Sequence, residues 1–116
     1  MSPIDPFDSK ALATATGGDD ALARELLGLY AARAERLSDT LRSAPLAQRR
    51  ALRDLAHGAR GSALAVGAVR VAQAAAALEA AAADDGDADR VSQARQALLT
   101  LLDESRRAAL QAGEDG

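Results

Sequence analysis

Aromatic residues are almost absent from this chain, and their scarcity limits the folds open to it. Of its 116 residues, 48% are hydrophobic but only 2% are aromatic, namely Phe7 and Tyr30. Alanine supplies most of the hydrophobic residues, so a core has to be built from leucine, valine and closely approaching alanine. Alanine has the highest helix propensity, whereas strands favour β-branched and aromatic residues. The composition therefore predicts an all-α fold, and the length predicts one domain over residues 1–116.

Composition and charge also limit the cellular locations and the classes of binding partner that we expect for this protein. The absence of cysteine excludes disulfides and thiolate metal sites and favours a reducing compartment. The N-terminal residues MSPIDPFDSK have neither region of a signal peptide, and no run of the sequence reaches the roughly 18 apolar residues that cross a membrane. We therefore expect a cytoplasmic protein that binds no membrane. A net charge of −3 and few aromatic side chains argue against nucleic acid as a partner, which leaves proteins or small molecules.

Breaks in the hydrophobic pattern divide the chain into a short N-terminal helix and four longer helices. The expected helices span about residues 7–15, 20–43, 46–66, 68–83 and 88–112. Asp19, in the loop TGGDD, is a suitable N-cap, and Pro45 ends one helix and suits the first turn of the next. In the second segment, apolar residues recur at steps of three and four, at Leu22, Leu26, Leu29, Tyr30, Leu37 and Leu41. Short loops between such helices predict an antiparallel up-and-down four-helix bundle, with the N-terminal helix packed across it.

The chain's only histidine, His57, lies in the stretch AHGARGSALAVGA, inside the helix expected over residues 46–66. On a helical wheel of 100° per residue, a buried stripe is formed by Leu52, Leu55, Ala56, Ala59, Ala63 and Val66. His57 faces water, and its exposed neighbours are Arg53, Arg60, Gly61 and Leu64. Arg60 and Gly61 stand on the next turn, three and four residues after the imidazole.

Two glycines this close to His57 need a reason, because each costs a helix about 1 kcal/mol relative to alanine. A single surface histidine usually has no role. Here, however, Gly61 clears the space beside the imidazole, Arg60 adds a cation, and Leu64 leaves an apolar group exposed. The outward position of Gly61 argues against the alternative, a close contact between helices, whereas helix packing is the simpler explanation for Gly58. These neighbours suit a site where another protein delivers an anion.

The stretch resembles the motif of the histidine phosphotransfer (Hpt) domain of multistep two-component phosphorelays. That motif has an alanine–histidine pair, a lysine or arginine three residues later, then a glycine and small residues, and a second glycine ten residues after the histidine. The matching residues are Ala56, His57, Arg60, Gly61, Ser62, Ala63, Gly67 and Ala68. Residues 17–41 look like the family's preceding helix, and Leu78 with Glu79 like the end of the following one, so the resemblance covers nearly the whole chain. The sequence departs from the family's pattern at Ala59, where a larger apolar residue is common, and at Arg60, where lysine is more common.

The resemblance implies that His57 accepts a phosphoryl group from a receiver domain's phospho-aspartate, or from a hybrid sensor kinase, and passes it to another receiver. A neutral imidazole is a competent nucleophile near pH 7 without a base beside it. Arg60 would offset the charge of the transferred group, and Ser62 would either orient the imidazole or bond to a backbone carbonyl. The partner would dock on Arg53, Gly61, Ser62, Leu64 and Gly67. The receiver domain would bring Mg²⁺, and this chain would need no cofactor of its own.

Other functions find less support in the sequence. No GxxxxGK[ST] phosphate loop is present, so we expect neither ATPase nor autokinase activity. His57 and Asp54 have no nucleophilic serine on the same face, and one histidine without cysteine is too few ligands for a metal site. The remaining alternative is a helical adaptor that binds a receiver or kinase without carrying phosphate, and it would need only the surface around His57. In either case we expect a monomer.

Overall fold

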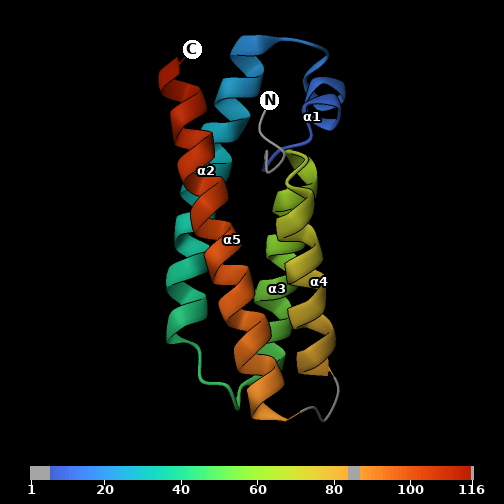
Figure 1. The fold of residues 1–116 in the computed structure, drawn as a ribbon, viewed down its shortest axis with the longest axis vertical. Helices are drawn as coiled ribbons and strands as arrows, with labels where there is room; N and C mark the ends of the chain where they lie inside the picture. The colour runs from blue at the N-terminus through green and yellow to red at the C-terminus, as the bar shows by residue number, and fades with distance from the viewer. Residues whose placement is uncertain (1–5, 84–86, 116) are drawn as a thin grey trace.

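The structure is a computed structural model that describes residues 6–83 and 87–115, and all regular structure in these residues is helical. The described residues form five helices: α1 (Ser9–Thr16), α2 (Asp20–Ser43), α3 (Arg49–Ala65), α4 (Val69–Ala83) and α5 (Ala88–Asp115) (Figure 1). The predicted all-α class is therefore confirmed. Within the described ranges, no helix combines the length and apolar character that spanning a membrane requires.

The four long helices form an up-and-down bundle (Figure 1), and the molecule measures 44 × 22 × 21 Å. Each long helix runs antiparallel to the next, and α1 lies at the end of the bundle where α2 begins and α3 ends. α3 packs against α4 and α2, and α5 packs against the same two helices, so α3 and α5 lie diagonally opposite. This arrangement confirms the predicted bundle with its short extra helix, and it leaves the outer face of α3 uncovered.

Aspartates are the N-cap residues of α1 and α2. The carboxylate of Asp8 accepts hydrogen bonds from the backbone N–H groups of Lys10 and Ala11. That of Asp19 accepts one from the N–H of Leu22, as expected of an N-cap.

The start of α3 differs from the prediction. Pro45 ends α2 but stays in the loop, where its carbonyl accepts a 3.0 Å hydrogen bond from the N–H of Gln48. Residues 45–48 form this turn and not the first turn of α3, so the helix begins at Arg49 rather than near Leu46. α5 runs on to Asp115, past the expected end near residue 112.

Leucine and alanine fill the core, as the composition predicts. Its largest fully buried side chains are Leu41, Leu52, Leu78, Leu98, Leu102, Val91 and Ser105. On α2 the predicted inner face is partly wrong, because Leu22 and Leu29 are 38% and 62% exposed while Leu27 is buried. The reason is that Ala31 and Ala34 also lie on the inner face. The centre of this face is therefore shifted around the helix from the position that Leu22 and Leu29 predicted.

A buried hydrogen bond joins α2 to α5. The hydroxyls of Tyr30 and Ser105 lie 2.7 Å apart, and Ser105 Oγ also lies 3.0 Å from the carbonyl of Leu102, to which it donates. Because a serine hydroxyl has one hydrogen, Tyr30 must be the donor to Ser105. The ring of Tyr30 also meets that of Phe7 edge to face, with centroids 5.8 Å apart, so the segment before α1 is held on the same core.

Candidate functional site

The site is built on α3, whose inner face has the residues that its spacing predicts. Ala56, Ala59 and Ala63 are fully buried beneath the exposed face, and of the predicted stripe only Leu55 is half-buried. His57 stands at the middle of the helix, and its side chain is 74% exposed. The predicted exposure of the imidazole is therefore confirmed.

A carboxylate of α4 lies against one nitrogen of the imidazole. Nδ1 of His57 is 3.3 Å from Oε2 of Glu79, whose side chain is 32% exposed. A carboxylate at this place favours the tautomer with hydrogen on Nδ1, so the lone pair is on Nε2, the nitrogen directed away from Glu79. Sequence reasoning matched Glu79 only to the end of a helix and gave it no role. Its position beside His57 depends on how α3 packs on α4, which no short spacing in the sequence reveals.

The predicted neighbours of His57 surround it on the open face. Arg53, Arg60 and Gly61 are exposed, and Leu64 is 57% exposed. Apart from the chain neighbours of Gly61 and the nearby backbone of α3, no atom of the described residues lies within 4 Å of the place where a Cβ of Gly61 would stand. The bundle itself therefore has no steric need for a glycine at this position.

Ser62 and Gly58 both contact Arg33, an α2 residue that the sequence analysis did not identify. Nε of Arg33 donates a 2.8 Å hydrogen bond to Oγ of Ser62, a partner other than the imidazole or backbone carbonyl considered for this serine. A Cβ at Gly58 would stand 3.2 Å from the Nη2 atom of Arg33, which is closer than ordinary packing. Gly58 thus leaves room for a guanidinium that crosses from α2 to α3, immediately beside His57 in the chain.

Gly67 belongs to the turn between α3 and α4 rather than to the open face. It is buried, with φ of +73°, and a Cβ would stand 2.8 Å from the backbone oxygen of Asp8. The N–H of Ala68 donates to the carbonyl of Ala63, and that of Gly67 to Leu64, which is a Schellman ending of α3. The N–H of Asp8 then donates a 2.7 Å hydrogen bond to the carbonyl of Gly67. The structure therefore corrects the inclusion of Gly67 in the docking surface.

Comparison with protein families shows which family the chain belongs to. The family model of the Hpt domain matches residues 25–108, from α2 to α5 and across the whole of α3. The chain belongs to the Hpt family. Hpt domains are helical bundles that take part in two-component phosphorelays, in which they interact with receiver domains and kinases. No match was found among curated proteins or among solved structures.

Proposed function

We propose that this Hpt protein is a phosphorelay intermediate. In this proposal His57 accepts a phosphoryl group from a receiver domain's phospho-aspartate, or from a hybrid sensor kinase, and donates it to another receiver. The observation that carries the proposal is the imidazole itself, 74% exposed at the middle of α3 with Nδ1 3.3 Å from Glu79. A nucleophile oriented through one nitrogen and open at the other is what attack on a protein-borne acyl phosphate requires.

The transfer step needs no other nucleophile from this chain. The lone pair of Nε2 attacks phosphorus, a P–N bond forms, and the P–O bond to the aspartate breaks as the carboxylate leaves with its electron pair. Nδ1 keeps its proton, and the carboxylate of Glu79 offsets the positive charge that the phosphorylated ring acquires. The same step in reverse passes the group to the next receiver. Mg²⁺ would be supplied by the receiver domain.

Arg60 would contribute electrostatic stabilisation. Phosphoryl transfer passes through a loose transition state that needs mainly correct positioning and stabilisation of charge. Arg60 is exposed one turn from His57, and no carboxylate among the described residues pairs with it. Its planar guanidinium can contact two phosphoryl oxygens, unlike the single ammonium of the more common lysine.

Gly61 gives independent support for a partner that comes close to the helix. A glycine in a helix interior is about 0.5–1 kcal/mol less favourable than alanine. Because the space beside Gly61 is open, the fold gains nothing sterically from accepting that cost. Close approach by another protein, in the manner of a receiver domain brought up to His57, accounts for it.

Phosphotransfer from labelled receiver domains tests the proposal. We expect the wild-type protein to become labelled on a bond that is lost in acid and survives in base, as a P–N bond would. His57→Gln should abolish labelling, while its helical content and unfolding free energy stay within about 0.5 kcal/mol of the wild type, since the side chain faces water. Arg60→Ala should slow transfer by about tenfold to a hundredfold, which corresponds to roughly 1.4–2.7 kcal/mol of transition-state stabilisation.

Two results would contradict this function. One is a His57→Gln protein that still accepts label. The other is a wild-type protein that no receiver or kinase of its own organism ever labels. Either result, combined with measurable binding to a receiver, would favour the adaptor that binds without carrying phosphate.

A further inference from the structure

We propose that Arg33 of α2 is a second cationic recognition residue of this site, which contacts the acidic phosphorylation site of the receiver domain on the α2 side of His57. The inference rests on the proposed function, because it concerns the partner that brings phosphate to His57. A phospho-aspartate and the carboxylates that hold Mg²⁺ form a surface rich in anionic oxygens. Guanidinium groups bind such oxygens, often two at a time.

Contacts with α3 determine where the guanidinium of Arg33 lies. Its Nε donates the 2.8 Å hydrogen bond to Ser62, and its Nη2 is the atom that a Cβ at Gly58 would approach to 3.2 Å. Gly58 follows His57 in the chain and points about 100° further round the helix, so the guanidinium lies over the α2 side of α3, next to the face that carries the imidazole. An arginine has five N–H donors, and the bond to Ser62 uses one of them. The other four are available to a ligand, because the described residues offer Arg33 no further hydrogen-bond partner.

The charge of Arg33 lies where α3 has no cation of its own. Arg53 and Arg60 project from the side of α3 nearer to α4, where Glu79 meets His57. The side that faces α2 carries instead Asp54, Gly58, Ser62 and Ala65. Arg33 therefore adds a cation on the α2-facing flank of α3, opposite the flank that carries Arg53 and Arg60.

The positive charge of Arg33 is not neutralised, because its side-chain hydrogen bond goes to Ser62 and not to a carboxylate. On the α2–α5 side of the bundle, some arginines pair with carboxylates: Arg42 with Asp39, and Arg106 and Arg107 with Asp103. Arg33 instead bonds to a neutral hydroxyl, which orients the guanidinium and keeps its full positive charge. A Cβ at position 58 would press on this guanidinium, so the glycine there favours the arrangement although it is unfavourable for the helix alone.

Arg33 also borders an open apolar hollow on the same face. Its apolar lining comes from Leu26 and Leu29 of α2 and Ala65 of α3, and Arg33 and Ser62 lie at its polar edge. A partner that covers His57 and reaches this hollow has to pass over the guanidinium. Arg33 therefore lies where it can bind an anionic group of the partner, between His57 and the apolar hollow.

Single-turnover phosphotransfer tests this role, with a phosphorylated receiver domain that labels the wild-type protein used over a range of concentrations. We expect Arg33→Gln to raise the half-saturating receiver concentration about tenfold and to make its dependence on salt shallower, because one charge contact is lost. Arg33→Lys should recover part of the loss. Gly58→Ala should raise the half-saturating concentration less, by displacing the guanidinium, while the melting temperature rises because alanine favours helix.

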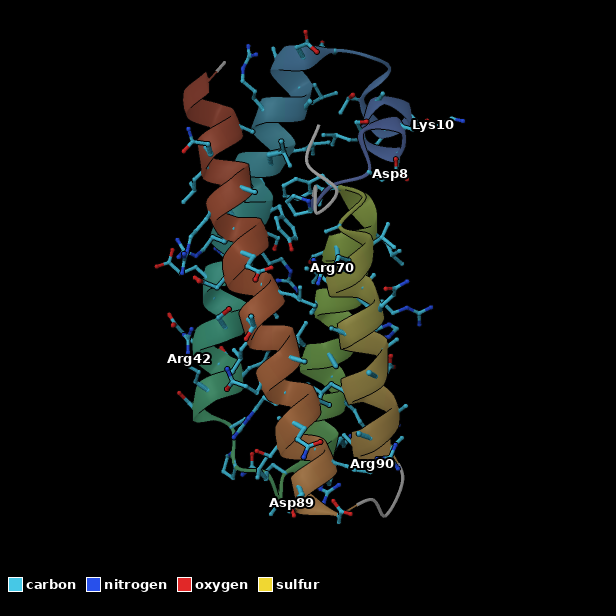
Figure 2. All side chains as sticks on the ribbon, viewed as in Figure 1. Asp8, Lys10, Arg42, Arg70, Asp89 and Arg90 are labelled. Carbon is cyan, nitrogen blue, oxygen red and sulfur yellow. The ribbon has the colours of Figure 1, made fainter. Side chains whose placement is uncertain are left out.

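The matched control is Arg90→Gln, which removes the same charge from α5, the helix diagonally opposite α3. Figure 2 shows Arg90 at the end of the bundle far from Asp8 and α1. This variant should transfer like the wild type. The proposal is overturned if Arg33→Gln lowers the melting temperature while the half-saturating concentration and its salt dependence stay at wild-type values, since Arg33 would then only tether α2 to α3.

Failure of the proposed function would be visible separately. If no receiver labels the wild-type protein, calorimetric titration with the unphosphorylated receiver domain decides the role of Arg33. A tenfold weaker affinity of Arg33→Gln, with Arg90→Gln unchanged, would support charge recognition by Arg33 in a protein that does not relay phosphate. Equal affinities of the two variants would overturn the inference.

Discussion

Three glycines around His57 occur for three different reasons, and only the structure separates them. Gly61 has open space where a side chain would stand, Gly58 makes room for Arg33, and Gly67 takes a left-handed conformation against the backbone of Asp8. All three lie within the stretch AHGARGSALAVGA, and a helical wheel distinguishes them only by direction. Backbone φ and the contacts made by other helices are not visible in a wheel, so Gly67 was assigned to the docking surface with Gly61.

Opposite effects of alanine at two of these glycines provide a test. Gly61→Ala should raise the unfolding free energy by about 0.5–1 kcal/mol, because alanine loses less backbone entropy and meets no atom. Gly67→Ala should lower it by about 1–2 kcal/mol or more, because a Cβ is unfavourable at positive φ and here also meets Asp8. Urea denaturation measures both changes. A Gly61→Ala protein less stable than the wild type would show that the bundle needs this glycine.

The residues around the imidazole show how far sequence reasoning reaches at this scale. The exposure of His57, Arg53, Arg60 and Leu64 follows from their spacing along one helix, and the structure confirms it. Glu79 and Arg33 belong to other helices, so their approach to α3 depends on interhelical packing. No periodicity within α3 contains that information.

At the scale of helices, alanine explains both the success and the failure of the prediction. On α3 the predicted stripe included alanine, and its Leu52, Ala56 and Ala63 are indeed buried. In α2 the same method misplaced Leu29, because the buried alanines of that helix were not counted as core residues. In a bundle whose helices pack through alanine, the inner face is better predicted by the smallest apolar residues together with leucine.

The buried hydrogen bond between α2 and α5 carries a prediction about stability and pH. Tyr30→Phe removes the donor to Ser105 and should lower the unfolding free energy by about 1 kcal/mol at pH 7. Burial raises the pKa of Tyr30 above its ordinary value of 10.0. The folded state therefore favours the neutral phenol.

The sign of the pH effect follows from that shift. The stabilising contribution of Tyr30 is complete below pH 10, the ordinary value, and is lost as the pH rises through the higher pKa of the folded state. The wild-type protein should thus lose stability above pH 10 more steeply than Tyr30→Phe, in urea denaturation at a series of pH values. Parallel curves for the two proteins would contradict this role of the phenol.

For the molecule as a whole, the distribution of charge differs between its faces. On α5, hydrogen bonds from Arg106 and then Arg107 hold the pKa of Asp103 below its usual value, so these charges neutralise one another. Around His57, the described residues supply no carboxylate to pair with Arg33 or Arg60. A chain with a net charge of −3 thus keeps two unpaired arginines near the proposed phosphorylation site, which favours association with an anionic partner.

Exposed leucines on opposite sides of the bundle allow the proposed docking of a receiver domain around His57 to be tested against a matched control. Leu64 on α3 is 57% exposed and Leu110 on α5 is 47% exposed, so equal substitutions disturb the fold to a similar, small extent. Leu64→Asp should weaken receiver binding at least tenfold, because a charge replaces an apolar contact that the partner would desolvate. Leu110→Asp should bind like the wild type in the same calorimetric titration.

A neutral variant separates apolar contact from charge in this experiment. An aspartate at position 64 would stand four residues after Arg60 and could pair with its guanidinium. Leu64→Ser removes the apolar side chain without that ion pair, and it should still weaken binding severalfold. If Leu64→Ser binds like the wild type while Leu64→Asp does not, the loss arises from the charge at Arg60. Equal binding by all three variants would mean that the receiver docks on another face, since α5 is diagonal to α3 and one partner domain cannot cover both around His57.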